Sequence, residues 1–181
     1  MIILLLFLLL INVYSYEICI VGADSTLGRE LVYQSLKDKK YHTLALTGKN
    51  YLTGKNKIIY EPSKYSNFRG NYLNPIFDEK LTIENYWCNI TQDYEHLIFC
   101  IDKYSLEYDY SDILMKKILI NLSNKCKSIT LINDFFIRDC KSRENTDKIL
   151  NSYKKKIKKN IHKPKGLYNK YKLSKDILEN L

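Results

Sequence analysis

The sequence lacks the residue spacings that mark a metal site or a disulfide scaffold. Its five cysteines are scattered, no two follow the Cys-x-x-Cys spacing, and no histidine stands at metal-ligand spacing. An odd number of cysteines without a regular framework argues against disulfide bonds as the main support of the fold. We therefore predict no metal ligands. Cys19 and Cys100 lie inside apolar runs, where a thiol behaves as a small buried hydrophobe.

The N-terminal apolar run is too short to cross a bilayer, which takes about 20 apolar residues. Residues 1–13 are almost wholly apolar, and the small residue Ser15 follows closely, although no Lys or Arg precedes the run. This pattern favours a signal peptide or a short hydrophobic anchor over residues 1–15, and hence a secretory or membrane-associated location. The alternative is an uncleaved apolar extension on a cytoplasmic protein. Contact with a membrane is expected only through this segment, if it is uncleaved.

Acidic residues are fewer than basic ones, with 20 Asp and Glu against 29 Lys and Arg, for a net charge of +9. Much of the excess lies in the run Lys154–Lys165. A basic patch favours anionic partners such as nucleotide phosphates, nucleic acid or an acidic membrane surface, although most such runs are solvated surface. Because the run has no interleaved aromatic residues and no recognised nucleic-acid motif, we do not expect nucleic-acid binding.

The chain also lacks long-period repeats and room for a second large core, since 181 residues suit a single domain. After Tyr16, short apolar runs alternate with helical patterns, which predicts βαβ units and a parallel sheet. We expect a Rossmann-like, doubly wound α/β domain of about five strands over residues 16–181. Residues 62–80 are expected as loop, and 141–165 carry no assignment. The expected strands are residues 16–21, 43–47, 57–60, 96–101 and 128–132, and the expected helices are residues 27–36, 82–92, 111–125 and 167–181.

The segment Gly22-Ala23-Asp24-Ser25-Thr26-Leu27-Gly28-Arg29 joins the first expected strand to the first expected helix, where a dinucleotide fold places its phosphate-binding turn. Gly22 suits the tight turn and Gly28 suits close packing of helix on sheet. Ser25 replaces the middle glycine, so we expect weakened rather than abolished phosphate binding. The alternative is a turn retained as scaffold with an empty pocket. The candidate cofactor-binding residues here are Gly22, Asp24, Ser25, Thr26, Leu27, Gly28 and Arg29.

No carboxylate follows the second expected strand, where a fold that prefers NAD carries an acidic residue for the ribose hydroxyls. The residues at that place are Thr47-Gly48-Lys49-Asn50. A cation suits the 2′-phosphate of NADP, so the sequence favours NADP over NAD, with Lys49 and Arg29 as the candidate contacts.

Residues 20–32 and the sequence Tyr171-Lys172-Leu173-Ser174-Lys175 resemble the extended and atypical short-chain dehydrogenases/reductases, which include epimerase/dehydratase-like and NmrA-like proteins. The resemblance implies an NADP-dependent oxidoreductase or a sugar-nucleotide epimerase/dehydratase-like enzyme acting on a small molecule. It implies Tyr171 as general acid/base, while Lys175 lowers its pKa and holds the nicotinamide ribose. An i,i+4 pair shares one helix face, which is compatible with these roles.

Two departures from the family pattern favour an alternative without catalysis. After residues 128–132 the family carries a catalytic Ser or Thr, whereas this chain has Asn133, which is able to supply only a hydrogen bond in its place. Family members also continue with a sixth strand after the Tyr/Lys helix, and this chain ends at Leu181. The alternative is a C-terminally truncated relative that binds a nucleotide or a protein partner. Apolar sheet surface left uncovered by truncation would favour a homodimer.

Overall fold

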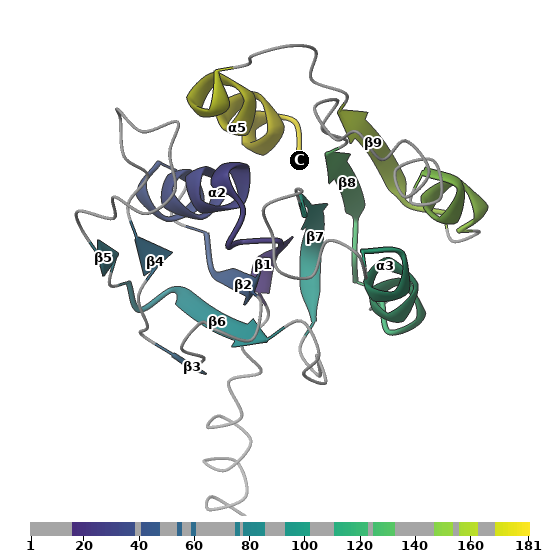
Figure 1. Cartoon of the computed structure of the whole chain (residues 1–181), viewed down its shortest axis with the longest axis horizontal. Helices are drawn as coiled ribbons and strands as arrows, with labels where there is room; N and C mark the ends of the chain where they lie inside the picture. Colours follow the sequence, from purple (N-terminus) through teal and green to yellow (C-terminus); the bar gives the residue numbers. More distant parts are fainter. Residues whose placement is uncertain are drawn as a thin grey trace, which may run out of the picture.

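Seven strands of the described residues lie side by side in one twisted sheet that helices cover, and two short strands pair separately (Figure 1). The computed structural model describes residues 16–38, 41–47, 54–55, 59–60, 75–76, 78–85, 93–101, 111–122, 125–132, 147–153, 156–162 and 169–181. The expected signal peptide or anchor at residues 1–15 lies outside these residues, as does most of the loop expected at 62–80, within which Pro75–Ile76 form the short strand β5.

Six parallel strands form the body of the sheet in the order β6-β2-β1-β7-β8-β9. Counted along the chain this order is 3-2-1-4-5-6, the order of a doubly wound dinucleotide-binding fold. The two-residue strand β3 pairs antiparallel with β6 at one edge. The bounds are β1 Tyr16–Val21, β2 Thr43–Thr47, β3 Gly54–Lys55, β6 Leu81–Asn85, β7 Tyr94–Phe99, β8 Ser128–Ile132 and β9 Lys158–His162.

Helices pack on both faces of the sheet, as βαβ crossovers require. Helices α2 (Thr26–Lys37) and α5 (Lys170–Glu179) share one buried apolar cluster with the sheet. Helix α3 (Ser111–Ile120) and the helical residues 147–152 contribute to a second cluster. The Rossmann-like α/β fold predicted from the sequence is therefore confirmed, with one more parallel strand than expected.

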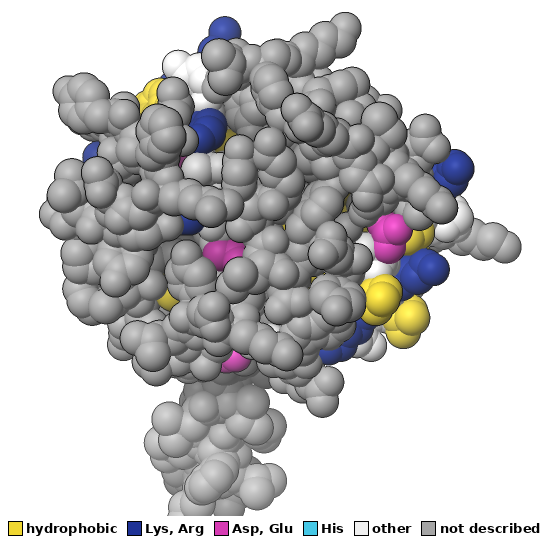
Figure 2. Space-filling view, viewed as in Figure 1, with side chains coloured by type: hydrophobic (Ala, Val, Ile, Leu, Met, Phe, Trp, Pro, Cys, Tyr) yellow, Lys and Arg dark blue, Asp and Glu magenta, His cyan; other side chains and the backbone are white. Residues whose placement is uncertain are grey.

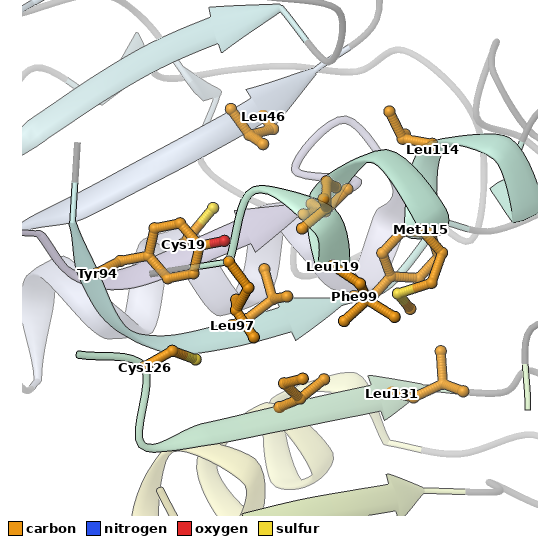
Figure 3. Close-up of a cluster of buried hydrophobic side chains, with 14 of the residues drawn as sticks. Cys19, Leu46, Tyr94, Leu97, Phe99, Leu114, Met115, Leu119, Cys126 and Leu131 are labelled. Atoms are coloured by element: carbon orange, nitrogen blue, oxygen red, sulfur yellow. The ribbon is translucent and has the colours of Figure 1, made fainter. Parts of the chain in front are cut away.

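The central strand β1 shows why residues Ile18–Val21 form an unbroken apolar run. Ile18 and Ile20 belong to the cluster beneath α2, whereas Cys19 and Val21 belong to the cluster beneath α3. All four side chains have no exposed surface, because a parallel strand inside the sheet is covered on both faces. Figure 3 shows the α3 cluster, in which the labelled residues are Cys19, Leu46, Tyr94, Leu97, Phe99, Leu114, Met115, Leu119, Cys126 and Leu131.

The predicted helix over residues 82–92 is wrong, because its first residues form strand β6 beside β2. Leu81 and Ile83 are fully buried, and Thr82 accepts a hydrogen bond of 2.9 Å from the Tyr16 hydroxyl. β-branched residues that alternate with apolar ones fit a strand better than a helix. The third strand predicted at 57–60 is instead the short β4 (Ile59–Tyr60), which pairs antiparallel with β5 (Pro75–Ile76) in a separate sheet.

The unassigned lysine-rich segment contains β9, a sixth parallel strand that precedes α5 and that the sequence pattern did not predict. Ile157 and Ile161 are partly buried against the α3 cluster, while Lys158 stays exposed. Strand β9 is the edge of the sheet, and lysines at an edge hinder pairing with a foreign strand.

Two half-buried histidines have pKa values below the ordinary value of 6.5. Burial lowers the pKa of His96, whose Nδ1 lies 2.8 Å from the Ser128 hydroxyl, and nearby Glu95 opposes the shift less strongly. Burial likewise lowers the pKa of His162 at the end of β9, against the smaller opposing effect of Asp176. The folded protein therefore holds protons on these rings less readily than the unfolded chain.

We expect the free energy of unfolding to decrease as the pH falls from about 7.5 to about 5.5. The contribution of His96 and His162 is present above their unfolded pKa and is lost as the pH falls through their lowered folded pKa values. Urea unfolding of the His96→Gln/His162→Gln variant should show a shallower decrease than the parent protein. His42→Gln is the matched control, and equal pH slopes in all three proteins would contradict the prediction.

Candidate functional site

The turn after β1 lies where the order of the parallel sheet reverses direction. Strand β1 stands between β2, which follows it in the chain, and β7, which comes later. The Cys100 N–H donates to the Val21 carbonyl at 2.8 Å, so β7 stays beside β1 up to the turn. In open α/β sheets, ligands bind outside the carboxyl ends of the strands at this switch point.

Gly22 makes the turn out of β1 in a conformation that favours glycine, with φ at +89°. A Cβ added at this position would lie 2.7 Å from the Ile101 nitrogen and 2.8 Å from the Cys100 carbonyl carbon. The Gly22 N–H donates a hydrogen bond of 3.1 Å to the Leu46 carbonyl, which ties the turn to β2. Both the backbone angle and the neighbouring strand therefore exclude a side chain here.

Gly28 lets α2 approach the same turn. A Cβ on Gly28 would lie 2.0 Å from the Gly22 carbonyl oxygen and 2.8 Å from the Ala23 Cα. Both neighbouring atoms belong to the backbone, which is unable to move aside as a flexible side chain does. The tight turn at Gly22 and the close helix packing at Gly28, both expected from the sequence, are present.

Ser25, which stands where the middle glycine is expected, is the N-cap of α2. Its hydroxyl accepts a hydrogen bond of 2.8 Å from the Gly28 N–H, and the residue is 1% exposed. The same hydroxyl lies 3.9 Å from the Cys100 thiol. The side chain therefore stabilises the first turn of the helix and uses one of the N–H groups that an anion would otherwise contact.

Arg29 folds back over the turn. Its Nε and Nη2 donate to the Asp24 carbonyl at 3.1 and 2.9 Å, which holds the guanidinium beside the helix N-terminus. Asp24 and Leu27 are buried, and Thr26 is half-buried. The structure thus brings Gly22, Asp24, Ser25, Thr26, Leu27, Gly28 and Arg29 together in one enclosed turn.

The structure places the backbone of Tyr171 beside Gln34, in the second half of α2. Helix α5 follows the sixth parallel strand. In the family that the sequence resembles, the Tyr/Lys helix is expected after the fifth strand. The Tyr171 carbonyl accepts a hydrogen bond of 3.1 Å from Gln34 Nε2, and Gln34 lies about 12 Å along α2 from its first residue, Thr26. The Tyr171 side chain is 53% exposed.

Lys175 shares α5 with Tyr171 but contacts Glu179, with 3.9 Å between Nζ and Oε1. Ser174, between the two, is fully buried and donates to the Lys170 carbonyl at 2.8 Å. The serine of the Tyr-x-x-Ser-Lys pattern therefore serves the packing of α5 on the α2 face. The roles of Tyr171 and Lys175 in catalysis stay predictions.

Two candidate residues, Lys49 and Asn133, lie outside the described residues. The strands that precede these two residues are described. Strand β2 ends at the buried Thr47 and β8 ends at Ile132, and both are parallel to β1. Their carboxyl ends therefore lie at the same edge of the sheet as Gly22.

Sequence reasoning missed two residues that support the turn and its helix. Cys100, expected only as a buried hydrophobe, donates its thiol proton to the Val21 carbonyl at 3.2 Å. Gln34 is 1% exposed and bridges α2 to α5, and among the described residues its Oε1 has no hydrogen-bond partner. Neither position carries a sequence signal, because both contacts join residues far apart in the chain.

Comparison of the chain with known protein families, with curated proteins and with solved structures finds no match. Over the described residues, no cluster of three or more His, Cys, Asp or Glu side chains is arranged to hold a metal ion. Within the same part of the chain, no helix has the length and apolar content needed to cross a membrane.

We expect Gly28→Ala to lower the free energy of unfolding by roughly 2 kcal/mol or more, because its Cβ would overlap the Gly22 carbonyl. The sign of the stability change is informative, because replacing glycine by alanine inside a helix ordinarily stabilises a protein by about 1 kcal/mol. Urea unfolding measures the change, with the exposed Lys37→Ala on the same helix as control. A Gly28→Ala protein as stable as the parent would show that α2 does not need this close approach.

Proposed function

We propose that this chain binds a dinucleotide, NADP in preference to NAD, at the turn between β1 and α2. The observation that carries the proposal is the pair Gly22 and Gly28. Both positions exclude a Cβ, and both lie at the carboxyl end of β1 where the sheet order reverses. This is the arrangement by which doubly wound folds bring a pyrophosphate to backbone N–H groups.

The electrostatics of the turn support an anionic ligand. The N-terminus of α2 points at the turn, and its first turn carries no acidic side chain to oppose a phosphate. Arg29 adds a positive charge, held in place through the Asp24 carbonyl. Lys49, which follows β2, is the proposed contact for the 2′-phosphate that distinguishes NADP from NAD.

Ser25 would set the strength of this binding. A pyrophosphate that approaches Gly28 N–H must compete with the Ser25 hydroxyl, which already accepts that hydrogen bond. The Ser25 Cβ also takes space that glycine leaves open. Binding is therefore expected to be weaker than in a turn with three glycines.

The bound cofactor has two candidate uses. The first is an NADP-dependent oxidoreductase or an epimerase/dehydratase-like enzyme, supported by the resemblance at Tyr171 and Lys175, with Tyr171 as general acid/base. The second is nucleotide binding without catalysis, supported by the contact of Tyr171 with Gln34 far along α2 and by the Lys175–Glu179 pair. The contacts of α5 favour the second.

Titration of the folded protein with NADPH and NADH should give saturable binding with NADPH preferred. We expect Ser25→Gly to tighten NADPH binding several-fold, because it removes the Cβ and releases the Gly28 N–H while a glycine N-cap costs only about a few tenths of a kcal/mol. Ser25→Ala keeps the Cβ and loses the cap, so it should lower stability by about 1 kcal/mol without the same gain in affinity. Nicotinamide fluorescence measures the affinities.

Lys49→Ala should reduce the preference for NADPH over NADH, whereas the matched Lys37→Ala should leave it unchanged. If neither the parent nor Ser25→Gly binds either cofactor while both are folded, the proposal of dinucleotide binding is rejected.

The Tyr171→Phe variant distinguishes the two uses. We expect it to leave NADPH affinity unchanged, because the contact of residue 171 with α2 is made by its backbone carbonyl. If the parent protein oxidises NADPH and the Tyr171→Phe variant does not, the result supports the enzyme instead. NADPH oxidation is also measured for Lys175→Gln. Because Lys175 is half-exposed, this substitution removes the Tyr/Lys pair without disturbing the packing of α5.

A further inference from the structure

Helix α3 carries an exposed apolar face opposite its buried one. Ile120 is 81% exposed and Ile113 is 57% exposed, while Leu114 and Met115 are fully buried against the sheet. Lys116, which is exposed, stands between the two isoleucines at spacings of three and four residues, so all three share the outer face of the helix. On the flank where Figure 1 draws α3, Figure 2 shows hydrophobic and basic side chains together with an acidic one.

The C-terminal end of α3 reaches the edge of the sheet at which β1 begins. Five residues after Ile120, Lys125 forms an ion pair of 2.6 Å with Asp93, whose carbonyl accepts a hydrogen bond from the Tyr16 N–H at 2.9 Å. Tyr16 is the first residue of β1 and follows the apolar run at residues 1–13 closely in sequence. The first residue of β1, which the apolar run precedes in the sequence, therefore lies at the edge near which α3 ends.

We propose that the outer face of α3 rests on the surface of an anionic lipid bilayer, with Ile113 and Ile120 in the headgroup layer. A helix with apolar and lysine side chains on one face binds at such an interface through buried apolar area and attraction to anionic lipid. Lys125 and Lys127 are paired with Asp93 and Glu95, so the isoleucines supply most of the contact and Lys116 meets the headgroups. The inference is independent of nucleotide binding.

A second copy of the chain fits this face less well than a bilayer. In a two-fold antiparallel pair of α3 helices, Ile113 of one copy would meet Ile120 of the other. Lys116 would then stand opposite Lys117 at the centre of the interface, where like charges repel. The net charge of +9 also favours an anionic surface over a second copy.

The test is flotation of the full chain with vesicles of phosphatidylcholine, with and without about one-third phosphatidylserine. We expect the Ile113→Ser/Ile120→Ser variant to bind the anionic vesicles roughly tenfold more weakly than the parent, because it loses apolar area in the interface. Lys116→Glu should weaken binding to the anionic vesicles several-fold and leave binding to the neutral ones unchanged.

Tyr171→Ser is the matched control, because Tyr171 is about as exposed as Ile113 but lies on α5, which packs on the opposite face of the sheet. Equal vesicle binding by the double variant and the parent would overturn the proposal and leave the apolar run as the contact. Loss of a dimer in sedimentation, with vesicle binding unchanged, would overturn it in favour of a second copy. Unchanged urea unfolding midpoints show that each variant is folded.

Discussion

The backbone contact between Gly28 and the Gly22 carbonyl is the constraint on which the described domain depends. It brings α2 against the end of β1, and this close approach lets Leu27 and Leu31 enter the apolar cluster that also holds β1 and α5. A side chain at Gly28 would lift the helix from the turn, and a side chain at Gly22 would overlap the backbone of Cys100 and Ile101. The contact that packs the helix against the sheet also places the helix N-terminus at the switch point. The fold and the candidate binding site therefore depend on the same contact.

Ser25 shows how a stabilising residue limits a binding site. As an N-cap it satisfies an N–H group that helix geometry leaves without a partner. A ligand phosphate would make the same hydrogen bond, so helix capping and phosphate binding compete for one donor. The glycine of a dinucleotide-binding turn leaves that donor for the ligand, whereas this chain uses it internally. The two outer glycines meet the packing requirement of the turn with or without a nucleotide, and the proposed binding site uses the same close approach.

The strands that could be predicted from the sequence are those covered on both faces. Strands β1, β2 and β8 are buried along almost their whole length, and their predicted bounds are confirmed. Strand β6 was missed because its alternating residues are followed by a polar stretch that favoured a helix, and β9 was missed because an edge strand tolerates lysines. The turn was predictable because its chemistry is local. The surroundings of Tyr171 were not, because i,i+4 spacing places two side chains on one helix face and says nothing of where that helix packs.

The hydrogen bond from Gln34 to the Tyr171 carbonyl joins residues separated by 137 positions. Helix α2 is synthesised well before α5, yet its apolar face is completed by Ile177 and Leu178 of α5. A nascent chain therefore carries that face incompletely covered until α5 is made, a period in which exposed apolar surface invites aggregation or chaperone binding. Native packing of the domain must largely follow translation of α5, although the residues of the turn at its centre are made much earlier.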